Sequence, residues 1–135
     1  MRYLVLALAL AIAPFSVNAQ RSVGPLSQPE INQIVGAVLA RKEVAMFLHP
    51  EVPERLPVKV AIAPPYSGIP VDLVLYGKPV RIVSDSADAV SLQILSSGDS
   101  ATVNVSYRRE GMAGTVKLER TQARWKAVEA RIYEH

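Results

Sequence analysis

The side chains best suited to hold a ligand lie near the C-terminus. Residues 125–133 alternate in the manner of a strand. One face of this strand would carry Trp125, Ala127, Glu129, Arg131 and Tyr133. A carboxylate and a guanidinium flanked by two aromatic rings could orient a polar ligand within a concave surface. We favour the other arrangement, in which the face with Val128 and Ile132 packs inward and leaves Glu129 and Arg131 exposed, because charges are rarely buried without a partner.

Catalytic groups are scarce in this chain. The two histidines are His49, directly before Pro50, and His135, the last residue. No serine lies in a G-x-S-x-G or S-x-x-K context, so no pattern indicates nucleophilic catalysis. Asp72 and Glu129 are the carboxylates that could act as a general acid or base. A small enzyme that uses one of them is an alternative hypothesis, and it requires that carboxylate to be buried with a raised pKa.

The sequence predicts neither a metal site nor a cofactor. The absence of Cys removes disulfides, thiolate catalysis and cysteine-ligated metals. An H-E-x-x-H zinc motif is also absent. Asp85 and Asp88 fall short of the roughly six to eight oxygens that Ca²⁺ requires, and a turn explains both residues. We therefore expect no bound metal and no cofactor.

Residues 1–19 have the pattern of a secretory signal peptide. Arg2 supplies a positive charge, residues 3–13 are apolar, and Val17-Asn18-Ala19 precedes a cleavage site predicted between Ala19 and Gln20. The apolar run is shorter than the roughly 20 residues that span a bilayer, so we expect no transmembrane segment after cleavage. The mature chain, residues 20–135, is then a single exported domain that is periplasmic or secreted.

The C-terminal part of the chain is rich in arginine, which could indicate a polyanion partner. The whole sequence has 15 Lys and Arg against 12 Asp and Glu, a formal net charge of +3. Within residues 107–133, Lys117 and Glu119 share a strand face with neighbours of opposite sign, while Arg109 and Glu110 fall in a turn. No aromatic residues are interleaved at the spacing that base stacking requires. We expect a solvated sheet surface and no nucleic-acid partner.

Residues 27–48 are predicted to form an amphipathic helix. Ser27-Gln28-Pro29-Glu30 fits a capping box with proline in the first turn. The apolar residues that follow have helical spacing: Ile31, Ile34, Val35, Val38 and Leu39. Because the residue before a proline is disfavoured in the α conformation, the helix should end at His49.

Residues 50–79 contain most of the ten prolines. These prolines bracket short alternating runs, which favours a segment with short strands over a polyproline ligand. The runs lie at 58–62 and 71–76, and Gly77-Lys78 predicts a two-residue turn into the next strand. Residues 80–133 follow the period-two pattern of an antiparallel meander. Its predicted turns are Ser96–Ser100, Arg109–Gly114 and Thr121–Arg124.

These elements define an α+β fold with one N-terminal amphipathic helix packed on a curved antiparallel meander. One helix followed by a long meander that closes on the strand RWKAVEARIY resembles the cystatin-like and nuclear-transport-factor-like cone folds. The resemblance covers residues 27–133 at the level of pattern, without a signature motif. Members of these folds include enzymes, inhibitors, ligand carriers and oligomerisation modules, so the resemblance implies an architecture and no particular activity.

The function that these observations favour is a non-catalytic protein-binding module, such as an inhibitor or immunity-type partner of an envelope or secreted protein. Binding residues concentrate on loops held by a scaffold. The candidate loops carry Tyr66 and Ser67 in one case and Arg109 and Glu110 in the other. A homodimer through unpaired edge strands is a further expectation. The alternative is a small-ligand carrier with a cavity lined by the last strand, in which a bound ligand would change the fluorescence of Trp125.

Overall fold

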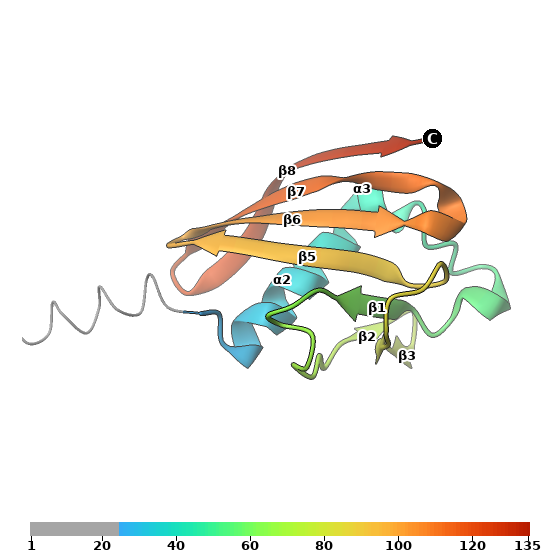
Figure 1. Ribbon diagram of the computed structural model, residues 1–135, viewed down its shortest axis with the longest axis horizontal. Coiled ribbons are helices and arrows are strands. Elements are labelled where there is room, and N and C mark those ends of the chain that lie inside the picture. Colours follow the sequence, from blue (N-terminus) through green and yellow to red (C-terminus); the bar gives the residue numbers. More distant parts are fainter. Residues whose placement is uncertain (1–24) are drawn as a thin grey trace, which may run out of the picture.

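The structure is a computed structural model that describes residues 25–135. The predicted signal peptide and its cleavage site lie outside these residues. The described chain forms one main helix, a mostly antiparallel sheet of six strands, and a small sheet of two strands (Figure 1). The predicted α+β class with an antiparallel sheet is therefore confirmed. Within the described residues, no helix is both long and apolar enough to cross a membrane.

Helix α2 (Gln28–Ala40) begins as its capping sequence predicts. The Oγ of Ser27 accepts a hydrogen bond from the backbone N–H of Glu30, and the Glu30 carboxylate accepts one from the backbone N–H of Ser27. The helix ends before the predicted boundary, because Arg41 has an extended backbone (φ −64°, ψ 127°). A separate short helix, α3 (Lys42–Ala45), follows. The single helix predicted over residues 27–48 is therefore wrong beyond Ala40.

The break at Arg41 follows from a change in the phase of the apolar positions. A straight continuation of α2 would turn positions 42, 45 and 46 toward the core. The chain instead has Lys42 and an exposed Met46 there, and the next fully buried side chains are Val44 and Leu48. A change of direction at Arg41 lets both apolar side chains reach the core.

The main sheet has the strand order β4-β1-β5-β6-β7-β8. The strands are β1 (Lys59–Ile62), β4 (Arg81–Ile82), β5 (Val90–Ser97), β6 (Ser100–Tyr107), β7 (Met112–Thr121) and β8 (Arg124–Glu134). Strands β5 to β8 form an antiparallel meander, whereas β1 pairs in parallel with both β4 and β5. The meander predicted for residues 80–133 therefore begins only at Val90, because the chain before it crosses over to the far side of β1.

The second sheet is a hairpin of β2 (Val74–Leu75) and β3 (Lys78–Pro79). Its two turn residues are Tyr76 and Gly77, which have the positive φ angles (52° and 80°) that a tight hairpin of this type needs. The turn predicted at Gly77-Lys78 is thus displaced by one residue. The strand predicted over residues 71–76 is short because the amide of Asn32 forms two hydrogen bonds with the backbone of Asp72, at 2.7 and 3.0 Å.

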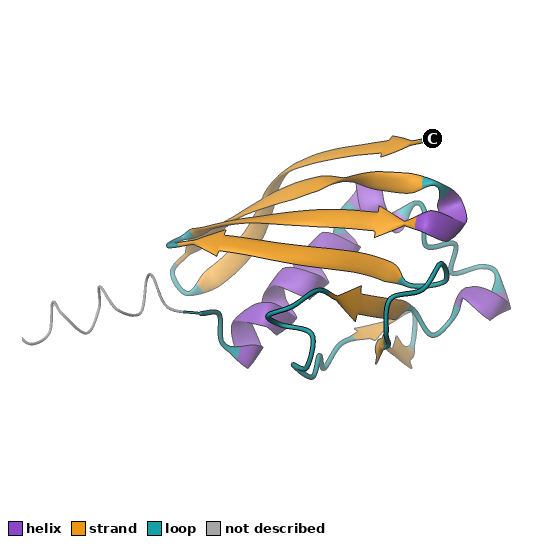
Figure 2. Ribbon diagram, viewed as in Figure 1, coloured by secondary structure: helices purple, strands orange, loops and turns teal. Residues whose placement is uncertain are grey.

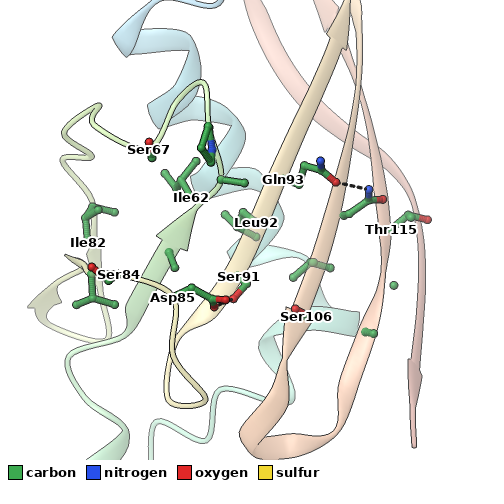
Figure 3. A pocket seen from close by; sticks show the side chains of 18 of the residues that line it. Ile62, Ser67, Ile82, Ser84, Asp85, Ser91, Leu92, Gln93, Ser106 and Thr115 are labelled. Atoms are coloured by element: carbon green, nitrogen blue, oxygen red, sulfur yellow. Dashed lines mark hydrogen bonds between the residues drawn. The ribbon is translucent and has the colours of Figure 1, made fainter.

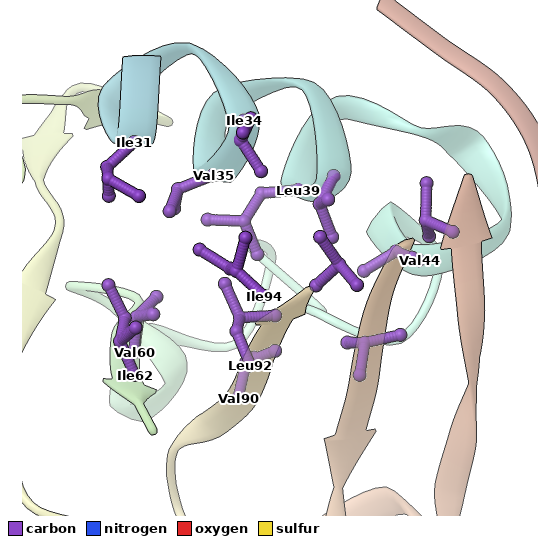
Figure 4. Close-up of a cluster of buried hydrophobic side chains, with 14 of the residues drawn as sticks. Ile31, Ile34, Val35, Leu39, Val44, Val60, Ile62, Val90, Leu92 and Ile94 are labelled. Carbon is purple, nitrogen blue, oxygen red and sulfur yellow. The ribbon is translucent and has the colours of Figure 1, made fainter. Parts of the chain in front are cut away.

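The hydrophobic core lies between α2 and one face of the main sheet (Figure 4). The helix contributes Ile31, Ile34, Val35, Val38 and Leu39. The sheet contributes alternate residues of each strand, among them Val60, Ile62, Val90, Leu92, Ile94, Val103, Val105, Val116 and Leu118. No polar or charged residue within residues 25–135 is buried. The helices therefore cover one face of the sheet, and its central strands present the other face away from them (Figure 2).

Candidate functional site

The sheet face opposite α2 carries a groove of about 1130 Å³ (Figure 3). Side chains along a strand alternate between the two faces, so the residues between the core positions form its floor. The polar floor residues are Ser91 and Gln93 on β5, Asn104 and Ser106 on β6, and Thr115 on β7, with Ala113 of β7 among them. The floor is consequently a row of hydroxyl and carboxamide groups on three adjacent central strands.

Hydrogen bonds fix several of these floor side chains. Gln93 and Asn104 lie opposite one another in the β5–β6 ladder, and Nδ2 of Asn104 donates to Oε1 of Gln93 at 3.0 Å. The hydroxyl of Ser91 donates to Oδ1 of Asp85 at 2.7 Å. Arg108 contacts the other oxygen of this carboxylate at 3.3 Å. These contacts orient the polar floor before any ligand arrives.

The two sides of the groove differ in chemistry. On the side of β1 and β4 the lining includes Ala63, Pro64, Ile82 and Val83, together with the exposed Ser67. On the side of β8 it consists of Arg131 and Tyr133. Ser84 and the carboxylate of Asp85 also line the groove, so a wall of mainly apolar groups with one carboxylate faces a cationic and aromatic wall across a polar floor.

A bulge in β8 determines which residues of the last strand reach this groove. Lys117 of β7 pairs with Glu129, whereas the next residue, Leu118, pairs with Ala127. Val128 is therefore an extra residue in β8. As a result, odd-numbered side chains face α2 before the bulge and face the groove after it. After the bulge, the side chains of Glu129, Arg131 and Tyr133 lie on the sheet face that carries the groove.

The prediction that Trp125, Glu129, Arg131 and Tyr133 occupy one face is wrong for this reason. Trp125 lies before the bulge and faces α2, where it is only 5% exposed. Glu129, Arg131 and Tyr133 lie after it, on the opposite face. The period-two pattern assumed a regular strand, and one inserted residue reverses that assignment.

Trp125 holds α2 against the end of the sheet. Its indole N–H donates to Oε2 of Glu30 at 3.0 Å, and its backbone N–H donates to Oε1 of Gln33 at 3.0 Å. The guanidinium of Arg120 lies 5.5 Å from the centroid of the indole ring. A ligand in the groove would be on the other side of the sheet, so the expected effect of ligand on Trp125 fluorescence is not supported by this geometry.

Of the four residues predicted to bind through loops, one lies in the groove lining. This residue is Ser67. Tyr66 is buried instead, and its hydroxyl accepts a hydrogen bond from the backbone N–H of Leu26 at 3.2 Å. Arg109 is ion-paired with Asp88 at 3.5 Å. These contacts give Tyr66 and Arg109 local structural roles away from the groove lining.

Glu110, in the 3-10 turn η2 (Arg108–Glu110), belongs to a cluster of charges at the end of the sheet. Its carboxylate lies 2.6 Å from the guanidinium of Arg55 and 3.0 Å from Nε2 of His49. Burial alone would raise the pKa of Glu110, but the hydrogen bonds from Arg55 and His49 lower it below its ordinary value. The carboxylate therefore stays ionised and ties η2 to η1 (Pro53–Arg55).

The two carboxylates proposed as acid or base candidates are not brought together in the groove. Asp72 is exposed, and its contacts are with Asn32 of α2. Glu129 has a side chain that is 43% exposed and is paired with Arg131 at 3.2 Å. Neither residue has the burial that the acid–base hypothesis requires.

The Ser91–Asp85 pair also lacks the properties of a catalytic pair. The hydrogen bond from Ser91 and the positive charge of Arg108 lower the pKa of Asp85, which makes this carboxylate a weaker base. Neither described histidine lines the groove. Within residues 25–135 no group of three or more His, Cys, Asp or Glu side chains could hold a metal ion.

The floor residues were visible in the sequence only as the polar positions of predicted strands. Their common feature, hydroxyl and carboxamide groups on adjacent strands in place of the charges found on β7 and β8, is the signal that could have identified them. The chain matches no family model, no curated protein and no solved structure. The fold and groove therefore define the class of this protein as an α+β domain with a polar-floored groove on an open sheet face.

Proposed function

We propose that this protein is a non-catalytic binding module that holds an extended segment of a partner protein in the groove. The observation that carries this proposal is the polar floor, in which Gln93, Asn104 and Ser91 are held on central strands by their own hydrogen bonds. A site that is oriented in advance loses less conformational entropy when it binds. The groove lining contains no histidine and no cysteine that would suggest a reaction.

The chemistry of the floor suits a peptide. A peptide backbone offers both donors and acceptors, and hydroxyl and carboxamide side chains can supply either. The apolar wall with Ile82 and Val83 can accept an apolar side chain, whereas Arg131 favours an acidic one. The volume of about 1130 Å³ exceeds the roughly 300–1,000 Å³ typical of small-molecule pockets, which favours a larger occupant such as a peptide.

Site-specific photo-cross-linking tests this proposal. A photoreactive amino acid at Thr115, on the groove floor, should form a covalent adduct with one partner protein in cells that naturally produce the chain. Thr102 is the matched control, because it is also a threonine that alternates with the core positions, but it does not line the groove. Equal adducts at both positions, or none at Thr115, would exclude the groove as the binding site.

A second candidate function is a small-ligand carrier. It is favoured by Arg131 and Tyr133, which line the same side of the groove and could bind an anionic or aromatic small molecule. Native mass spectrometry of the protein recovered without denaturation distinguishes the two candidates. A protein-sized addition to the mass supports the peptide-binding module, whereas a small adduct that is lost in the Arg131→Ala variant supports the carrier.

The signal-peptide pattern of residues 1–19 predicts that the protein is exported. An exported protein would meet its partner in the envelope or outside the cell. N-terminal sequencing of the native protein should find Gln20 as the first residue. The resemblance to the cystatin-like and nuclear-transport-factor-like folds stays a prediction. We include it in the proposal because such folds present a sheet face beside a covering helix, as the described residues do here.

A further inference from the structure

Strand β8 is at the edge of the main sheet, and only part of that edge is covered. Within residues 25–135, β7 pairs with one side of β8 and no strand pairs with the other. Before the bulge the outer side is occupied, because Gln33 accepts from the N–H of Trp125 and Arg41 donates to the carbonyl of Ala127 at 3.4 Å. After the bulge, the described chain provides no such contact to the backbone of residues 128–134. An uncovered edge of this kind is a template for another strand.

The hydrogen bonds between β8 and β7 show which backbone N–H and C=O groups of β8 point away from the sheet. The N–H of His135 donates to the carbonyl of Gly111 at 2.8 Å, so residue 135 is directed toward β7. In an antiparallel strand, the backbone N–H and C=O groups of every second residue point to the same side. Those of residues 133, 131 and 129 therefore also point toward β7. Ala130, Ile132 and Glu134 direct their backbone N–H and C=O groups away from the sheet. Within residues 25–135 these groups form a short row of donors and acceptors without a partner.

We propose that β8 pairs antiparallel with β8 of a second copy of this chain, around a two-fold axis at Ala130. In this register Glu129 lies opposite the partner's Arg131, and the symmetry makes the same ion pair twice. Val128, which is 49% exposed, lies opposite the partner's Ile132. The side chain of Arg131 is 78% exposed in the single chain, so it has room to accept this contact.

Charge selects this register among the neighbouring ones. A two-fold axis at Arg131 would place two arginines opposite each other, and like charges directly opposite are destabilising. An axis at Ile132 also satisfies the backbone parity, but it places Arg131 opposite the partner's Tyr133 and Glu129 opposite the partner's His135, so no glutamate–arginine pair crosses the interface. The arrangement centred on Ala130 satisfies both the parity and the charges.

This pairing would also change the groove. Arg131 and Tyr133 form the side of the groove at the β8 edge, so the two grooves would meet across the two-fold axis. The partner's Glu129 would then stand beside Arg131 at that junction, on the same face of the joined sheet. The inference concerns the free protein and goes beyond the proposed function, because the dimer forms without any groove ligand.

Analytical ultracentrifugation of the purified protein over a range of concentrations tests the interface. The wild type should show a reversible monomer–dimer equilibrium. Arg131→Glu and Glu129→Arg should each raise the dimer dissociation constant by roughly tenfold or more, because each replaces two attractive pairs with repulsive ones. The double variant Glu129→Arg/Arg131→Glu should return the constant to within about threefold of wild type. Arg124→Glu, the same charge change on β8 before the bulge, should leave the constant unchanged.

Urea denaturation of each variant confirms that the compared proteins are folded. A wild type that is monomeric at all concentrations would overturn the proposal, as would an Arg131→Glu variant that dimerises as tightly as wild type. A cysteine tests the register directly, because the natural chain has none. Ala130→Cys should form a disulfide-linked dimer on mild oxidation faster than Ile132→Cys, and the reverse order would overturn the axis at Ala130.

Discussion

At the scale of single residues, Glu30 connects α2 to two strands of the meander, β7 and β8. Its carboxylate completes the capping box with Ser27, and it also accepts hydrogen bonds from Trp125 and Arg120 at 3.0 and 2.7 Å. Burial alone would raise the pKa of Glu30, but the hydrogen bonds from Trp125 and Ser27 and the charge of Arg120 hold it below its ordinary value. The sequence predicted the local contact with Ser27 from spacing. The contacts with Trp125 and Arg120 span some 90 positions, and no local pattern encodes them.

Replacement of Glu30 by Gln keeps the shape of the side chain but leaves Arg120 without one of its charged partners. We expect the free energy of unfolding at neutral pH to fall by about 1–3 kcal/mol. Since the pKa of Glu30 is lowered in the folded state, the wild type should lose this advantage as the pH falls below 4.5. Urea denaturation at several pH values measures both effects. Glu54→Gln, at an exposed glutamate, should change the stability little, and equal effects of the two variants would contradict this role for Glu30.

At the scale of elements, the sequence predicted the strands in which buried and exposed residues alternate. It did not predict the position in β8 where this alternation breaks. The runs at β5, β6 and β7 bury every second residue, as their patterns indicate. In β8 the bulge at Val128 changes the parity, and no residue there marks it. The parallel pairing of β1 with β4 and β5 was also not predictable, because a short apolar run specifies burial but not its neighbours. Of the predicted ligand-binding residues, only Arg131 and Tyr133 therefore line the groove.

The close approach of β7 and β8 makes Gly114 essential to their pairing. A Cβ at this position would overlap the carbonyl oxygen of Arg131 and lie 2.8 Å from the Cα of Ile132. Because both are backbone atoms, they cannot move aside as a flexible side chain would. We expect Gly114→Ala to destabilise the fold by about 1–3 kcal/mol, measured by urea denaturation. Gly68→Ala is the control, since a Cβ there meets nothing within 4 Å, and a stable Gly114→Ala variant would show that β8 is not held this closely.

At the scale of the whole molecule, charged clusters close the two ends of the sheet. At the end with the β5–β6 turn, Arg120 bridges Glu30 and Asp99, with 2.7 Å to each. At the end with the β6–β7 turn, Glu110 bridges Arg55 and His49. Each cluster joins the N-terminal half of the chain to the meander. The strands between them are held by apolar packing on one face and leave the other face to the groove.

The second cluster should make stability depend on pH through His49. The hydrogen bond to Glu51 raises the pKa of His49, partial burial opposes it, and Glu110 raises it further. A raised pKa in the folded state means that protonated His49 stabilises the fold below its unfolded value near 6.5, and that this contribution is lost as the pH rises through the higher folded value. His49→Asn removes the charge and tolerates the positive φ of 50° at this position.

The difference in urea midpoint between wild type and His49→Asn should therefore be largest near about pH 5.5 and smallest near about pH 8.5. A difference that does not change over this range would show that the titration of His49 is not linked to folding. Glu51→Gln provides a further comparison, because it removes the largest cause of the raised pKa and should reduce the pH dependence.

The contacts of α2 with β8 have a consequence for the synthesis of the chain. The first described helix is joined to the last strand through Glu30 with Trp125, Gln33 with Trp125, and Arg41 with Ala127. While the ribosome is still adding β8, the apolar face of α2 lacks part of its covering. These three contacts can therefore form only after β8 has emerged from the ribosome, so the packing of α2 on this end of the sheet is completed late in the synthesis of residues 25–135.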